Sequence, residues 1–156
     1  MIKKTISIYF HFRHPITLNN RKLLKSFLAT MLETADHKRA MINIIFCSDD
    51  ALLEINQLYL SHDYYTDIIT FDLSDNRKEK LLSDIYISTE RVKDNAQHLN
   101  TPMETELLRV IFHGVLHLLG FKDKTSHQQK EMRKKEEEWL TAYKDYKSRE
   151  QASKTS

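Results

Sequence analysis

Apolar and polar residues alternate along residues 5–12, which is the pattern of a strand with one buried face. Three further runs, rich in β-branched residues, predict strands over residues 41–46, 68–71 and 84–88. The pattern therefore predicts a sheet of about four strands. It leaves the direction of each strand open.

Between and after these strands, apolar residues recur every three or four positions, which predicts helices. The helices are expected to begin near residues 20, 48, 89, 101 and 126. Thr101 and Glu104 have the spacing of a capping box with Pro102 at the first helical position, and Ser126 with Gln129 can cap the last helix. This last helix is highly charged, so we expect it to pack on the outside of the core.

The order of these elements predicts one α/β (α+β) domain, in which a small mixed sheet of about four strands packs against five helices. The length of 156 residues suits a single domain with a core of its own. We expect this domain to span residues 1–147, and residues 148–156 to form a frayed tail.

Glycine is scarce: the chain has two, Gly114 and Gly120, where average usage predicts about eleven. Loops that cradle phosphates or dinucleotides need several glycines at fixed spacings, so those classes of protein are excluded. Gly120 is expected to end a helix in a left-handed conformation. Gly114 lies inside that helix, which predicts the close approach of a substrate or of another backbone.

A single cysteine, Cys47, excludes an intrachain disulfide framework and a cysteine-rich zinc finger. It follows the apolar residues 42–46, so we expect a buried, unreactive thiol. No apolar run approaches the ~18 residues that cross a membrane, and the first residues do not form a signal-peptide core. These features are compatible with a cytoplasmic protein, and we expect no membrane partner.

Basic residues are concentrated near the N-terminus: residues 1–32 hold six Lys or Arg and no Asp or Glu. Such a segment can contact nucleic-acid phosphates or another anionic surface. Alternatively, these charges only keep the exposed faces of a strand and a helix in contact with water. Charge alone leaves both interpretations open.

His113 and His117 are four residues apart on one predicted helix, which places both imidazoles on one face, as chelation of a single metal requires. A turn at Gly120 and a third ligand at Asp123 complete a spacing that is typical of zinc sites, and His127 is the alternative third ligand. Three protein ligands leave one position open for water, as in a catalytic site. The other histidines lack such spacing and are expected at surface or packing positions: His11, His14, His37, His62 and His98.

Gly114 also argues against one class of zinc enzyme. In peptidases with the HExxH motif, the residue after the first histidine is the glutamate that acts as general base. Glycine has no side chain that accepts a proton. The sequence therefore disfavours a peptidase, whereas a hydrolase in which the metal generates hydroxide stays open.

The stretch HGVLHLLGFKD, residues 113–123, resembles the signature of the YbeY family, the metal-dependent endoribonucleases of ribosomal RNA maturation. Three further blocks are similar to that family in the same order. They are the block from residue 55 to residue 71, the strand at residues 83–88, and the start of the helix at residues 91–96.

The resemblance implies a small α/β domain whose metal-binding helix lines a cleft. It implies that His113, His117 and Asp123 hold one Zn²⁺, or another divalent metal, and that the two histidines are catalytic. The implied activity is single-strand-specific endoribonuclease action in late maturation of the small-subunit ribosomal RNA 3′ end, with roles in ribosome biogenesis and quality control. The implied partners are single-stranded or ribosomal RNA and the small ribosomal subunit.

The chain departs from the family pattern at several positions, one of which is Lys122 in place of an aspartate. Asp123 replaces the third histidine, Tyr65 replaces a proline, and Leu60 replaces an arginine that would suit a phosphate contact. Arg109 and Arg91 are candidates for that phosphate contact, or they are ordinary salt-bridge arginines. Two other functions also stay open. One is a zinc hydrolase of another substrate class, such as a phosphatase or peptidase. The other is a non-catalytic ribosome-assembly factor with a structural metal.

Overall fold

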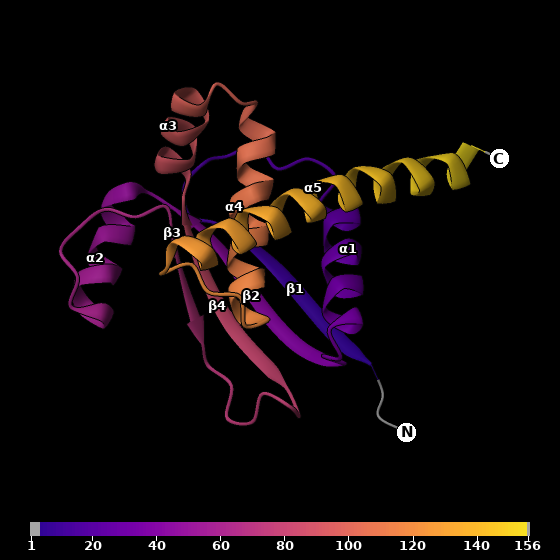
Figure 1. Cartoon of the computed structure of the whole chain (residues 1–156), viewed down its shortest axis with the longest axis horizontal. Coiled ribbons are helices and arrows are strands. Elements are labelled where there is room, and N and C mark those ends of the chain that lie inside the picture. The colour runs from indigo at the N-terminus through magenta and orange to yellow at the C-terminus, as the bar shows by residue number, and fades with distance from the viewer. Residues whose placement is uncertain (1–3, 156) are drawn as a thin grey trace.

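Four strands form one mixed sheet in the computed structural model, which describes residues 4–155 (Figure 1). The strands are β1 (Thr5–Phe12), β2 (Arg39–Cys47), β3 (Ile68–Asp72) and β4 (Leu81–Ser88), and their order is β1-β2-β4-β3. β1, β2 and β4 run parallel, and β3 pairs with β4 in the antiparallel direction. β1 and β3 are therefore the two edges of the sheet.

Five helices lie around this sheet in the described part of the chain, which confirms the predicted α+β class. They are α1 (Arg21–Thr34), α2 (Asp49–Leu60), α3 (Thr89–Leu99), α4 (Met103–Leu118) and α5 (Ser126–Thr155). None of the helices within residues 4–155 is long and apolar enough to cross a membrane.

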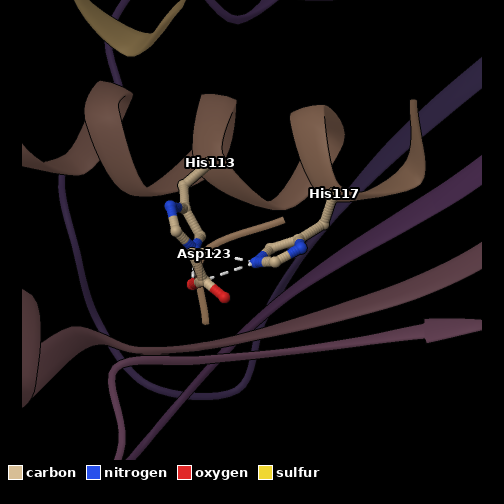
Figure 2. Close-up of side chains that lie close together, drawn as sticks. All are labelled: His113, His117 and Asp123. Atoms are coloured by element: carbon tan, nitrogen blue, oxygen red, sulfur yellow. Dashed lines mark hydrogen bonds and ion pairs between the residues drawn. The ribbon is translucent and has the colours of Figure 1, made fainter. Parts of the chain in front are cut away.

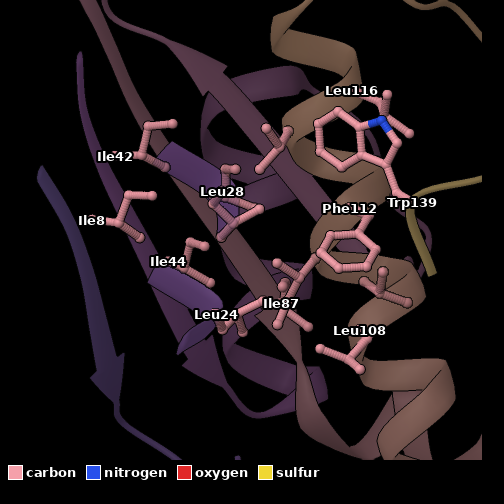
Figure 3. Packing of buried hydrophobic residues seen from close by; sticks show 14 of the residues in the cluster. Ile8, Leu24, Leu28, Ile42, Ile44, Ile87, Leu108, Phe112, Leu116 and Trp139 are labelled. Carbon is pink, nitrogen blue, oxygen red and sulfur yellow. The ribbon is translucent and has the colours of Figure 1, made fainter. Parts of the chain in front are cut away.

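The two faces of the sheet bury different sets of side chains, because alternate residues of a strand point to opposite faces. On one face, apolar residues of β1, β2 and β4 pack against α1, α3, α4 and α5 and form the main core. Figure 3 shows this packing, with labelled members Ile8, Leu24, Leu28, Ile42, Ile44, Ile87, Leu108, Phe112, Leu116 and Trp139. On the other face, α2 covers a smaller cluster of Cys47, Leu52 and Ile69, which confirms that the cysteine is buried.

Helix α5 packs on the outside of the core as predicted, and Met132, Trp139 and Tyr143 on its inner face are buried in that core. The helix continues to Thr155, where a frayed tail is expected from residue 148; residue 156 lies outside the described residues. The later turns are mostly exposed, but their Lys, Glu, Gln and Ala residues favour helix, and extending an existing helix requires no new nucleation.

The helix starts predicted before α4 and α5 are each displaced. The carbonyl of Pro102 accepts from the N–H of Glu106 at 3.1 Å, so proline flanks α4 instead of beginning it, and the buried Thr101 hydroxyl has no hydrogen-bond partner. At α5 the reciprocal capping box lies one residue earlier than predicted. There the Thr125 hydroxyl accepts from the N–H of Gln128, and the Gln128 side chain accepts from the N–H of Thr125, each at 3.1 Å.

The two glycines have separate structural reasons. Gly120 has a φ of 100°, and it follows α4 in a Schellman motif, since the N–H of Phe121 reaches the Leu116 carbonyl at 3.1 Å. This confirms the predicted helix end. A Cβ at Gly114 would lie 2.8 Å from Cδ1 of Ile68 and 3.1 Å from Cγ2 of Ile85. The nearest neighbours at Gly114 are therefore side chains of β3 and β4.

Candidate metal centre

One face of α4 packs on the sheet, and its partly exposed face carries both predicted histidines. His113 and His117 are one helical turn apart, with ring centroids 4.6 Å apart. The Schellman motif at Gly120 then reverses the chain direction, and Asp123 returns toward the two rings (Figure 2). The three side chains are 21%, 30% and 38% exposed, so the group is neither fully buried nor fully solvated.

The ligand atoms of this group have the spacing that a tetrahedral cation needs. Nε2 of His117 lies 3.1 Å from Nε2 of His113, and Oδ2 of Asp123 lies 3.2 Å from each of these nitrogens. Ligands about 2.0–2.2 Å from a tetrahedral Zn²⁺ are roughly 3.3–3.5 Å apart. His113, His117 and Asp123 could therefore hold a metal ion with only small adjustments.

The alternative third ligand, His127, is not part of this group. It lies at the start of α5, where its side chain is exposed. Among the described residues, the cluster of potential ligand atoms within 4.8 Å of one another contains Asp123 and leaves His127 out. The geometry therefore favours the carboxylate as the third ligand.

Glu136 is a site residue that the sequence pattern does not identify. It lies on α5 with a side chain 6% exposed, and its Oε2 is 2.7 Å from Nδ1 of His113. A histidine that donates Nδ1–H to a carboxylate is fixed in orientation and presents Nε2 as the metal ligand. This contact joins positions 23 residues apart in the chain, so no local motif reveals it.

The charge state of His113 reflects these neighbours. Burial lowers the pKa of its imidazole, but the hydrogen bond and charge of Glu136, with the charges of Asp123 and Asp67, outweigh burial and raise the pKa above its ordinary value. The same negative surroundings favour any cation at this position. A metal ion and a proton therefore compete for the same site.

Two hollows open beside the candidate ligands. One has a volume of about 350 Å³ and is lined by Asp67, His113, Asp123 and Glu136, among others. The other is about 630 Å³ and is lined by residues of the α2–β3 segment together with all three candidate ligands. Asp67 borders both hollows, and burial raises the pKa of its carboxyl, although His113 partly opposes this.

Both arginines proposed as phosphate contacts are engaged by carboxylates. Arg109 has a side chain 12% exposed, and its guanidinium contacts Glu106, Glu136 and Glu137. Arg91 pairs with Asp49 at 2.8 Å, and its guanidinium lies 5.2 Å from the ring centre of Tyr65. Their direct role in catalysis stays a prediction.

Arg77 is a cation of this site that the sequence pattern does not identify. It lies in the loop between β3 and β4, pairs with Asp72 at 3.2 Å and donates to the carbonyl of Leu118. It lines the larger hollow together with Leu60, the position where the family pattern has arginine. The sequence signal that could have indicated Arg77 is its place in the polar loop between the strands predicted over residues 68–71 and 84–88.

Comparison with known proteins places this geometry in context. A family model described as Endoribonuclease YbeY matches residues 11–144. A protein of Christiangramia forsetii named Endoribonuclease YbeY is 43% identical over 136 residues, which cover 87% of this chain and 94% of that protein. A protein of the same name from Cytophaga hutchinsonii is 47% identical over 124 residues, which cover 80% and 86%. The solution structure of TM1509 from Thermotoga maritima is similar, with a TM-score of 0.58, 30% identity and coverage of 93% of each chain.

Proposed function

Because the chain belongs to the endoribonuclease YbeY family, we propose that it is a zinc-dependent endoribonuclease that cleaves single-stranded RNA. Its proposed role is late maturation of ribosomal RNA at the 3′ end of the small-subunit RNA, with a part in ribosome biogenesis and quality control. The small ribosomal subunit is then its partner, and the cytoplasm is its place of action.

The convergence of His113, His117 and Asp123 beside an open hollow carries this proposal. Two imidazoles and a carboxylate suit Zn²⁺, and three protein ligands leave one position for water or for a phosphodiester oxygen. When bound there, Zn²⁺ supplies Lewis-acid polarisation of that oxygen and lowers the pKa of a bound water.

The remaining roles belong to side chains of the chain itself. Nε2 of His113 and Nε2 of His117 face Oδ2 of Asp123, and Glu136 holds the first ring from behind through Nδ1. The residue after His113 is Gly114, so no glutamate side chain lies between the two histidines of the helix. This arrangement supports hydrolysis that depends on the metal, and it lacks the proton acceptor of a HExxH peptidase.

We assign the basic N-terminal segment to the RNA backbone outside the cleaved bond. Strand β1 carries part of this segment and forms the sheet edge opposite β3. Two of its aromatic rings lie under basic side chains of α1: Arg21 is 4.2 Å from the ring centre of Phe12, and Lys25 is 5.4 Å from that of Phe10. Phosphate contacts there would be remote from His113 and would weaken as salt rises.

The proposal is tested by following cleavage of single-stranded RNA, duplex RNA, a phosphomonoester and a peptide, each with and without a chelator. We expect cleavage of the single-stranded RNA alone, and we expect the chelator to abolish it. Cleavage of the phosphomonoester or the peptide instead would contradict the proposed substrate class. Absence of any hydrolysis by the zinc-loaded protein would favour an assembly factor.

The ligand assignment is tested separately, by the zinc content of purified variants. His113→Ala and Asp123→Ala should lose stoichiometric zinc, whereas the matched control His127→Ala should retain it. An Asp123→Ala protein that retains one zinc per chain would contradict the assignment. The end group of the product then reports the attacking group, because activated water leaves a 3′-hydroxyl and the RNA 2′-hydroxyl leaves a cyclic phosphate.

A further inference from the structure

Exposed apolar side chains gather at the end of α2 and in the loop that follows it. Five large hydrophobic residues of this segment are exposed by 40% or more: Leu58, Tyr59, Leu60, Tyr64 and Tyr65. A concentration of exposed aromatic surface in one short segment is typical of a contact surface rather than of a solvated loop. The segment borders the larger hollow at the candidate metal centre.

Within this segment, two rings lie face to face. The imidazole of His62 and the phenol ring of Tyr64 have centroids 5.0 Å apart and planes inclined by only 20°, and the Tyr64 hydroxyl contacts Nδ1 of His62 at 3.0 Å. Both residues line the hollow that His113, His117 and Asp123 also line, and Tyr64 is 56% exposed. A flat pair of rings therefore borders the same space as the candidate ligands.

The loop that carries the two rings is fixed to α2. Asn56 is 1% exposed, and its side-chain amide donates to the Tyr64 carbonyl at 2.9 Å. The Asn56 carbonyl accepts from the N–H of His62 at 3.1 Å. One buried asparagine thus holds the backbones of both ring-bearing residues, so the two rings are already in position before a ligand binds.

We propose that His62 and Tyr64 form a stacking platform for a base of the single-stranded RNA whose backbone lies at the metal centre. This inference rests on the proposed function and names how its substrate is recognised. Aromatic rings bind unpaired bases because every base has a flat π-face, at about 1–3 kcal/mol per stacked base. Bases inside a duplex are already stacked on their neighbours, so the platform selects single strands.

The hollow is lined by charges of both signs. Of its three aspartates, Asp72 pairs with Arg77 and Asp123 is a candidate metal ligand, so Lys124, Arg77 and a bound cation are the groups that would meet a phosphate. Lys124 is exposed at the rim, and the guanidinium of Arg77 has donors in addition to those that hold Asp72 and the Leu118 carbonyl. A nucleotide presents a flat base and an adjacent phosphate. The hollow combines paired rings with cationic groups, which is the complementary chemistry.

The platform is tested by fluorescence anisotropy with a short labelled oligoadenylate and with an abasic oligomer of the same length, while cleavage is followed in parallel. Tyr64→Ala should bind oligoadenylate roughly tenfold more weakly, because one stacked base is lost, and should bind the abasic oligomer as the wild type does. Tyr64→Phe should retain the affinity. Tyr64→Leu should lose it, because leucine is apolar but not flat.

Two further variants serve as controls. Leu99→Ala truncates a large apolar side chain, 49% exposed, at the end of α3 and outside the surfaces assigned to RNA, and should bind both oligomers normally. Lys124→Ala should weaken binding of both oligomers alike and lower the salt dependence, since it removes a phosphate contact. If Tyr64→Ala binds oligoadenylate as the wild type does, the stacking platform is overturned, whereas the proposed nuclease function is not affected. This is the result expected if the aromatic segment binds a protein partner instead. A wild-type protein that neither binds nor cleaves RNA would overturn the proposed function itself.

Discussion

Glu136 shows how a single residue of one helix prepares a side chain of another. Its carboxylate is buried between α4 and α5, within 4.0 Å of Arg109, His113 and Arg133. Burying a carboxylate costs free energy unless charged partners compensate for the lost water. One of these partners is His113, a candidate metal ligand. The hydrogen bond that compensates the buried carboxylate therefore also fixes the orientation of the His113 ring.

We predict that Glu136→Gln weakens zinc binding about 10- to 100-fold, because the neutral amide no longer strengthens the donor at Nδ1 of His113. Competition with a chromogenic chelator measures this affinity without reference to activity. Glu137→Gln is the matched control, since this neighbour contacts Arg109 but is 58% exposed and does not reach the histidine. Equal losses of zinc affinity in the two variants would show that the negative charge of α5 matters and that the hydrogen bond from His113 to Glu136 does not.

Cys47 predicts a pH dependence of stability that is independent of the metal centre. Burial raises the pKa of its thiol from 9.0 to about 11, although the charge of Arg13 partly opposes this. Between these values the unfolded chain loses a proton that the folded chain keeps, so this contribution to stability is complete below pH 9 and is lost as the pH rises toward 11.

The predicted loss from this one group is about 2–3 kcal/mol across that interval. Urea unfolding of the wild type and Cys47→Ala at several pH values measures it. Cys47→Ala should show a shallower decline of the unfolding free energy above pH 9, whatever its stability at neutral pH. Parallel curves for the two proteins would assign the decline to other groups.

At the scale of elements, the sequence predicts each helix and strand but not how the strands pair. The alternation of apolar and polar residues predicts both ends of β1 correctly. The spacing of His113 and His117 identifies both histidines of the candidate metal centre. Both signals are local in the sequence. The antiparallel pairing of β3 with β4 and the placement of Glu136 beside His113 depend on contacts between distant segments. Such contacts depend on how distant segments pack, and the periodicity of apolar residues within one segment does not report this packing.

Gly114 provides a prediction about how α4 meets the sheet. Gly114→Ala improves helix propensity by about 1 kcal/mol, but its Cβ would meet Ile68 and Ile85 at 2.8 and 3.1 Å. Overpacking of this kind costs about 1–3 kcal/mol, so we expect a net destabilisation of roughly 1 kcal/mol in denaturant unfolding. Repeating the substitution in Ile68→Val, which lacks the nearest methyl group, should remove most of the loss. Equal losses in both backgrounds would locate the conflict elsewhere.

At the scale of the whole molecule, the candidate metal centre and the core occupy different faces of one helix. Phe112 and Leu116 of α4 are fully buried beneath α5 and against the sheet, whereas His113 and His117 are partly exposed beside the hollows. The main core joins β1, β2 and β4 with four helices and includes none of the candidate ligands. The packing that holds the fold therefore does not pass through the metal.

This separation predicts the result of removing the metal from the intact protein. A chelator should abolish RNA cleavage while the far-UV circular dichroism and the near-UV signal of Trp139 stay unchanged, because the core remains packed. The melting temperature should fall by only a few degrees, roughly the amount that mass action from one bound ligand provides. Adding zinc back should restore cleavage. Loss of the near-UV signal together with cleavage would instead make the metal structural, since a domain that folds around its metal unfolds without it.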